Sequence, residues 1–148
     1  MGGNIIVDNN IKRSIILDNY QDAKNKGIPQ DKDNYIKINS NNVSCIDNID
    51  IYVKLDGNKI VDIKYDGEAC VIAISSTSIL SNLLIGKTIE EANEILGNYY
   101  NMIEEKEYNS ELLEEANVYD DIYKQPSRKT CATLFARGIS KLINDDRK

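Results

Sequence analysis

The stretch IYVKLDGNKIVDIKYDGEACVIAISSTSILSNLLIG, residues 51–86, contains the change of hydrophobic period that decides the fold. Up to Tyr65, apolar and polar residues alternate on both sides of Asp56-Gly57, which is typical of a β-hairpin with one buried face. From about Ser75, the apolar residues recur every three to four positions, which indicates a helix. The stretch therefore predicts two antiparallel strands followed closely by a helix.

Two further elements are predicted upstream of the hairpin. Ile36 and Ile38 alternate with polar residues and predict a third strand, antiparallel to the others. Before it, helical spacing predicts a helix of about residues 11–26, with Asn10 as its N-cap and Gly27 at its end. The N-terminal helix thus precedes the strands.

Helices are predicted downstream of the hairpin helix. Thr88 and Glu91 have the spacing of a capping box and open a strongly periodic helix. A short acidic helix around residues 110–116 and a final helix that begins close to Cys131 follow. This order predicts one domain over residues 1–148, of α+β class, in which helices pack on one face of a three-stranded antiparallel sheet.

Composition excludes several classes of protein. The chain has 148 residues, a net charge of −6 and no histidine. The acidic balance argues against nucleic acid as a partner, because its binders need basic patches. No apolar run approaches the ~20 residues of a membrane span, and the N-terminus does not resemble a signal peptide, so we expect a cytoplasmic location, reduced thiols and no membrane partner. Lack of histidine excludes Ser-His-Asp and Cys-His catalysis from within the chain.

The three cysteines and one aspartate are the candidate chemical groups. Cys45, Cys70 and Cys131 form no CxxC pair, but each is predicted at the end of an element, where distant segments converge. Asp47 follows Cys45 by two positions, so both side chains face the same side of an extended segment. Three sulfurs and one oxygen suit tetrahedral zinc, with Zn–S bonds of ~2.3 Å, or a small iron–sulfur cluster.

A plainer interpretation stays open at this point. Free cysteine is among the most buried residue types and often only fills space in a core. In that case Asp47 is a solvated loop carboxylate or a cap. The predicted place of Cys131 at a helix N-terminus favours the chemical interpretation, because the helix dipole there stabilises a thiolate.

Several segments resemble one family of proteins. DGEACVIAISSTS (66–78) resembles the GxGCxIS-x-ASxS segment of the SufU/IscU-type iron–sulfur cluster assembly proteins, which are related to the NifU N-terminal domain. SCID (44–47) resembles their CGD segment, and PSRKTCATLFARGI (126–139) resembles the SufU ending. IscU-type members carry histidine where this chain has Thr130, so the chain is identified as a SufU-type member. Ile46 and Ala69 stand where the family has glycines.

The resemblance implies a specific site and activity. Cys45, Asp47, Cys70 and Cys131 are the expected metal ligands, with zinc as the expected metal. Cys45 is the expected acceptor of persulfide sulfur from a cysteine desulfurase of SufS type, which makes the chain a sulfurtransferase-like acceptor rather than a stand-alone enzyme. Arg128 is expected near the partner interface.

Two other functions remain open on the same residues. In the first, the protein is a scaffold that carries a transient [2Fe–2S] cluster and passes it to apo iron–sulfur proteins or other assembly factors. In the second, the metal only stabilises the fold of an interaction module.

Overall fold

The computed structural model describes residues 8–42 and 46–145. Its longer elements are α1 (Asn9–Gln21), β1 (Ile36–Asn41), β2 (Asn48–Asp56), β3 (Lys59–Glu68), α2 (Val71–Leu84), α3 (Ile89–Ile103), α4 (Pro126–Ala132) and α5 (Leu134–Asp145). Short 3-10 helices lie between them: η1 (Lys32–Asn34), η2 (Ser110–Leu112), η3 (Glu114–Tyr119) and η4 (Ile122–Lys124). No helix among the described residues is long and apolar enough to span a bilayer.

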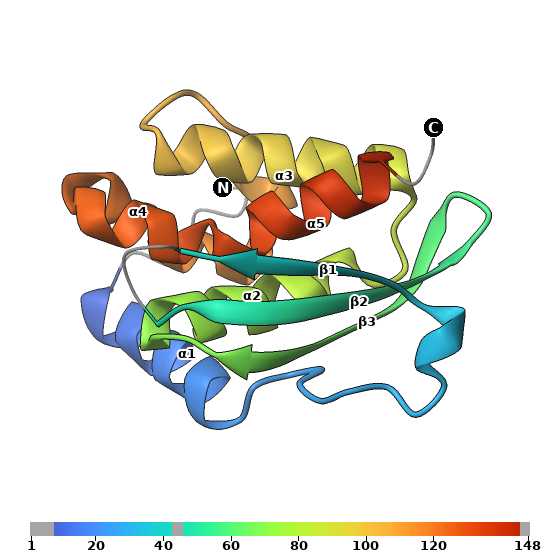
Figure 1. Ribbon diagram of the computed structural model, residues 1–148. Helices are drawn as coiled ribbons and strands as arrows, with labels where there is room; N and C mark the ends of the chain where they lie inside the picture. The colour runs from blue at the N-terminus through green and yellow to red at the C-terminus, as the bar shows by residue number, and fades with distance from the viewer. Residues whose placement is uncertain (1–7, 43–45, 146–148) are drawn as a thin grey trace.

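One antiparallel sheet in the order β1-β2-β3 carries helices on one face, as the sequence predicts (Figure 1). Alternation along β2 sends Ile49, Ile51 and Val53 into the core. Asn48 pairs with Glu68 at the far end of the hairpin, so the end of β3 lies beside the start of β2. The predicted α+β class, with an N-terminal helix before the strands, is confirmed.

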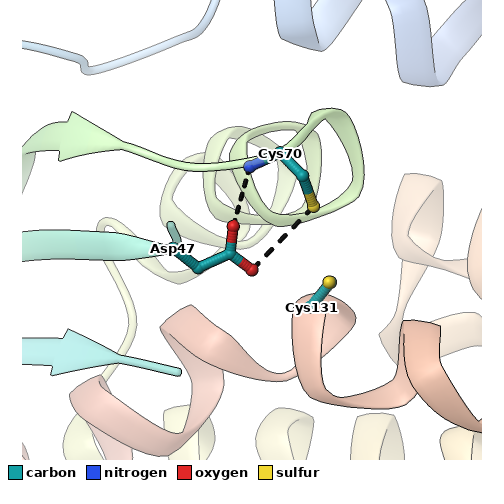
Figure 2. A group of neighbouring side chains, drawn as sticks. All are labelled: Asp47, Cys70 and Cys131. Atoms are coloured by element: carbon teal, nitrogen blue, oxygen red, sulfur yellow. Dashed lines mark hydrogen bonds between the residues drawn. The ribbon is translucent and has the colours of Figure 1, made fainter. Parts of the chain in front are cut away.

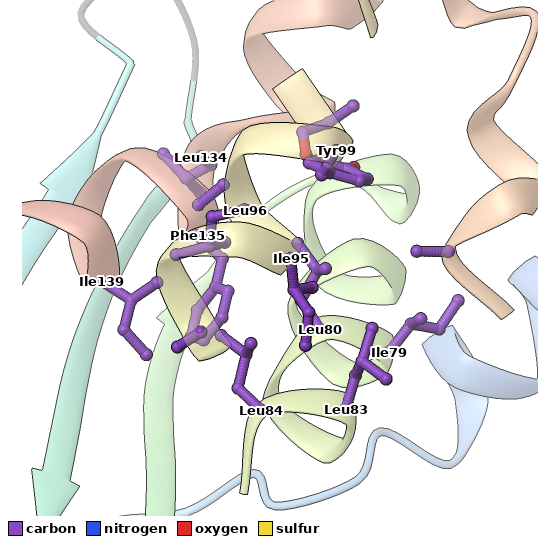
Figure 3. Close-up of a cluster of buried hydrophobic side chains, with 14 of the residues drawn as sticks. Ile79, Leu80, Leu83, Leu84, Ile95, Leu96, Tyr99, Leu134, Phe135 and Ile139 are labelled. Atoms are coloured by element: carbon purple, nitrogen blue, oxygen red, sulfur yellow. Dashed lines mark hydrogen bonds between the residues drawn. The ribbon is translucent and has the colours of Figure 1, made fainter. Parts of the chain in front are cut away.

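The core lies between the sheet and helices α2, α3 and α5 (Figure 3). Helix α2 is buried at 11 of its 14 residues, so it is the central element, and α1, α4 and α5 all pack against it. Some of its buried hydroxyl groups form hydrogen bonds within the helix. The side chains of Ser76 and Thr77 both donate to the backbone carbonyl of Ala73.

Helix α1 differs from the prediction at both ends. Asp8 is the N-cap rather than Asn10, and its carboxylate accepts the backbone N–H of Asn10 at 2.7 Å. The helix ends at Gln21 instead of continuing to residue 26, because the next segment bonds to other elements. The backbone N–H of Lys24 donates to Ser78 in α2, and the carbonyl of Lys24 accepts the Tyr65 hydroxyl.

Helix α2 begins at Val71 rather than near Ser75. Cys70 is its N-cap residue, and the Cys70 carbonyl accepts the first helical hydrogen bond from Ile74 at 2.9 Å. The apolar run of residues 71–74 hid this start, because a short buried run has no period that separates strand from helix. Cys70 therefore does lie at a strand-to-helix junction.

The C-terminal half differs more. The predicted acidic helix around 110–116 is a pair of 3-10 turns, η2 and η3. The predicted final helix is two helices that break at Thr133, and the first of them begins at Pro126, which is tolerated at a helix start because its missing N–H would be unpaired there. Cys131 accordingly lies in the last turn of α4, so the predicted helix N-terminus at Cys131 is wrong. The capping box of Thr88 and Glu91 is confirmed.

Candidate metal centre

Three of the four predicted ligands converge at one end of the sheet. One ligand atom from each of Asp47, Cys70 and Cys131 lies within 4.8 Å of the others (Figure 2). Asp47 stands just before β2, Cys70 caps α2, and Cys131 is in α4. Both cysteines are free thiols. Cys45, the fourth predicted ligand, lies outside the described residues.

The carboxylate of Asp47 is buried and held from two sides. Asp47 is only 1% exposed. Burial of a charged group is costly unless hydrogen bonds compensate for the lost water. Oδ1 accepts the backbone N–H of Cys70 at 2.9 Å, and Oδ2 accepts Nδ2 of Asn42 at 3.0 Å. Oδ2 is also the oxygen that faces the Cys70 sulfur, at 3.9 Å (Figure 2).

Gly67 allows the two segments of this site to approach. Its φ is +137°, a conformation that essentially only glycine adopts without strain. A Cβ at this position would stand 2.3 Å from the carbonyl oxygen of Asn48. Because Asn48 follows Asp47 and Gly67 precedes Cys70 by three positions, a side chain here would push apart the segments that carry two of the ligands.

The thiol of Cys131 is held in its protonated form in the absence of a cation. Burial, the largest cause, acts together with the neighbouring Cys70 and Asp47 to raise its pKa to about 12. The position in the last turn of α4 adds no stabilisation of a thiolate, because the negative end of the helix dipole is there. A bound cation is the kind of charge that reverses this situation, since a coordinating thiol is deprotonated outright.

The donor set fits a small divalent metal such as zinc. Two thiol sulfurs and one carboxylate oxygen are ligand types that zinc prefers. Around a tetrahedral ion with Zn–S bonds of ~2.3 Å and Zn–O bonds of ~2.0–2.2 Å, a sulfur and an oxygen ligand stand about 3.5–3.7 Å apart. The Cys70 Sγ and Asp47 Oδ2 atoms are 3.9 Å apart, a little more than that separation, and the three-atom group is contained within 4.8 Å.

Two residues of the site were missed by sequence reasoning. Asn42 is buried behind Asp47, and Arg137 on α5 donates from Nη2 to the Asn42 side-chain oxygen at 2.6 Å. The only sequence signal for Asn42 is its place in a polar segment before Cys45. Arg137 has no such signal, because the residues that it bonds to in the site lie in other segments. The predicted partner residue Arg128 is exposed on α4, three positions before Cys131 and so on a neighbouring part of the helix surface.

The chain is similar to known proteins of one family. The family model of the NifU-like N-terminal domain matches residues 11–132. The zinc-dependent sulfurtransferase SufU of Bacillus subtilis is 34% identical over 130 residues, which cover 87% of this chain and 86% of that protein. The iron–sulfur cluster assembly scaffold protein IscU of Streptococcus pyogenes is 34% identical over 104 residues, 70% of this chain and 65% of that one.

A solved structure has the same fold. It is described as a candidate iron–sulfur cluster assembly scaffold protein for the SUF system from Fervidobacterium islandicum. It superposes with a TM-score of 0.80 at 30% sequence identity, and the match covers 87% of this chain and 93% of that one.

Proposed function

The chain belongs to the NifU-like N-terminal domain family, and on that premise we propose that it is a SufU-type protein of iron–sulfur cluster assembly that binds zinc and accepts sulfur from a cysteine desulfurase. The observation that carries the proposal is the convergence of Asp47, Cys70 and Cys131, which come from three separate elements. Inert core cysteines would have no reason to gather around one buried carboxylate.

Cys45 completes the proposed ligand set. It stands two positions before Asp47, and zinc sites of this kind take four ligands. When bound, zinc supplies the positive charge that keeps its thiol ligands ionised at neutral pH. Thr130 supports the zinc-binding, SufU-type assignment, because IscU-type members have a histidine at this position and this chain contains none.

The proposed transfer is a thiol exchange in which no net oxidation occurs. The Cys45 thiolate attacks the outer sulfur of the persulfide on the partner's cysteine. A new S–S bond forms at Cys45, the S–S bond of the partner breaks, and the partner's cysteine leaves as a thiolate. A proton on the outer sulfur stays with it or is lost to solvent. Arg128, exposed beside the site on α4, is the proposed contact for the partner.

The ligand set is tested by zinc content. Asp47→Asn, Cys70→Ser and Cys131→Ser should each lower the zinc bound per chain in the purified protein. Asp50→Asn is the matched control. Asp50 lies nearby on β2 but at the surface, where its Oδ2 is 3.7 Å from Nζ of Lys37. Zinc content that is the same in all four variants and the native protein would end the proposal.

The sulfur-acceptor role is tested separately with a SufS-type cysteine desulfurase and cysteine. The native protein should raise sulfide production, and Cys45→Ser should abolish that stimulation. Arg128→Ala should weaken it without loss of zinc. Lys129→Ala removes an equal charge from the neighbouring position, where Lys129 pairs with Glu104 at 3.2 Å, and should have little effect. Absence of stimulation by the native protein would refute the acceptor role.

A second function is favoured by the likeness to the scaffold IscU of Streptococcus pyogenes. In this alternative, the same four residues carry a [2Fe–2S] cluster as cargo for apo iron–sulfur proteins. Anaerobic reconstitution followed by transfer to an apo-acceptor distinguishes the two. A visible absorption spectrum and transfer support the scaffold, whereas a colourless protein that retains zinc supports the sulfur acceptor.

A further inference from the structure

Arg137, Asn42 and Asp47 form a chain of side-chain hydrogen bonds behind the candidate metal centre. Arg137 Nη2 donates to Asn42 Oδ1 at 2.6 Å, and Asn42 Nδ2 donates to Asp47 Oδ2 at 3.0 Å. Neither Arg137 nor Asn42 is among the predicted ligands. The chain connects α5 to the Asp47 carboxylate.

The direction of the chain is fixed by chemistry. A guanidinium has donors only, so the oxygen of the Asn42 amide must face Arg137. The amide nitrogen must then face Asp47, where an ionised carboxylate accepts. The amide nitrogen also donates to the carbonyl of Thr130 at 3.4 Å, so Arg137 holds the oxygen side of the Asn42 amide while two acceptors hold its nitrogen side.

The same arginine also reaches the segment that carries Cys131. Arg137 Nη2 donates to the carbonyl of Thr130 at 2.8 Å, and Arg137 Nε donates to the Thr133 hydroxyl at 3.2 Å. Thr130 and Cys131 are adjacent, so one guanidinium is bonded both to the peptide beside a sulfur ligand and, through Asn42, to the oxygen ligand. Two ligand segments are thereby set relative to one another.

Oδ2 of Asp47 is the oxygen affected by this arrangement. Oδ1 is occupied by the N–H of Cys70, and Oδ2 faces the sulfur of Cys70. A carboxylate oxygen accepts more than one partner, so Oδ2 has capacity for both the Asn42 amide and a metal. Such outer partners of metal ligands fix the ligand's orientation, and their loss costs about 10- to 100-fold in metal affinity.

We propose that Arg137 is a positioning residue that acts through Asn42 to hold the Asp47 carboxylate toward the two sulfurs. This inference rests on the proposed zinc site, but it concerns residues outside the ligand set. In this proposal, Arg137 and Asn42 support the Asp47 ligand without binding the metal themselves.

The test is the zinc dissociation constant, measured by competition with a chromophoric chelator. Asn42→Asp keeps the size of the side chain and its bond to Arg137, but it places a carboxylate against Asp47; affinity should fall by about 10- to 100-fold. Arg137→Met keeps the aliphatic stem and should lose affinity toward the lower end of that range. Arg137→Lys retains a donor with charge and should lie closer to the native protein than Arg137→Met does.

Control variants and a second readout separate positioning from general damage. Asn93 and Asn144 bond to each other at 3.0 Å on α3 and α5, and Asn93→Asp should leave zinc affinity unchanged. Cobalt-substituted protein gives a spectroscopic readout, because weak d–d bands indicate loss of tetrahedral geometry. The unfolding midpoint of the metal-free variants in urea shows which of them fold.

The outcomes are distinct. If the native protein binds no zinc, the proposed function itself fails. If the native protein binds zinc and both Asn42→Asp and Arg137→Met stay within twofold of it, with unaltered cobalt spectra, the positioning role is overturned alone. If Asn42→Asp does not fold, the comparison of Arg137→Lys with Arg137→Met decides, and equal loss in both overturns the proposal.

Discussion

Replacement of Gly67 by alanine tests how the fold assembles the site. The new Cβ would stand 2.3 Å from the Asn48 carbonyl oxygen and 2.9 Å from the Ile49 Cα, both backbone atoms that cannot turn away. The residue would also be held at φ +137°, where backbone strain alone costs about 1–3 kcal/mol. The steric overlap adds about 1–3 kcal/mol, the usual range for overpacking.

A loss of about 4 kcal/mol in the free energy of unfolding is therefore expected, with a fall of roughly 8–16 °C in Tm at about 2–4 °C for each kcal/mol. Urea unfolding of the metal-free protein gives the free energy, and chelator competition gives the zinc affinity. Both should decline together, because the clash separates the Asp47 and Cys70 segments. Metal binding stabilises only the folded state in which the ligand side chains lie close together.

Two other glycines provide matched controls. Gly57 has φ +64° with open space around its Cβ position, so Gly57→Ala should cost strain only, about 1–2 kcal/mol. Gly97 lies within α3, also in open space, and Gly97→Ala should stabilise by about 0.5–1 kcal/mol. Neither should change zinc affinity. A Gly67→Ala variant that loses no more stability than Gly57→Ala, or that keeps its zinc affinity, would contradict this role of Gly67.

Three further perturbations have defined expectations. Gly138→Ala places a Cβ 2.9 Å from the Ser40 Cβ and should destabilise by about 1–3 kcal/mol in urea unfolding; an increase in stability would contradict the close packing of α5 on β1. Tyr119→Phe removes a buried hydrogen bond to Ser75 and should cost about 0.5–1.5 kcal/mol, and an unchanged urea midpoint would argue against that bond. The pKa of Cys131 is raised to about 12, so its thiol must lose a proton when zinc binds. Zinc affinity should therefore increase from pH 6 to pH 8, and an affinity in chelator competition that does not change with pH would contradict this.

The same raised pKa has a consequence for the metal-free protein. The unfolded Cys131 thiol ionises near pH 9, whereas the folded thiol keeps its proton until about pH 12. The contribution of this group to stability is thus fully present below pH 9 and is lost as pH rises toward 12. Cys131→Ser should therefore show a shallower decline in the urea midpoint over that range.

Sequence reasoning found the elements whose signals are local. The alternation on both sides of Asp56-Gly57 predicted the hairpin, and the capping box of Thr88 and Glu91 predicted the start of α3. It failed where another element supplies the partner. Helix α1 ends at Gln21 because the Lys24 segment bonds to Tyr65 and Ser78, which no local pattern reveals.

Sequence reasoning selected three side chains that the structure brings together, Asp47, Cys70 and Cys131, and it missed the residues that surround them. Side chains that bear sulfur are few enough to be chosen by type, and Asp47 was chosen by its spacing from Cys45. The helix around Cys131 was placed wrongly because its start was expected close to Cys131, whereas α4 begins at Pro126, a residue type that a helix start tolerates. Asn42 and Arg137 could not be predicted, since an amide and a guanidinium meet here across elements that are far apart in the sequence.

X-ray absorption at the zinc edge of the purified native protein reports the atoms that surround the metal. We expect about one zinc per chain with three sulfur neighbours at ~2.3 Å and one oxygen neighbour at ~2.0–2.2 Å. Replacement of Asp47 by asparagine should alter the oxygen shell and keep the sulfur shell. A shell of oxygen or nitrogen alone, or the absence of zinc and iron from protein as isolated, would contradict the claim that these distant thiols and one carboxylate bind a common metal.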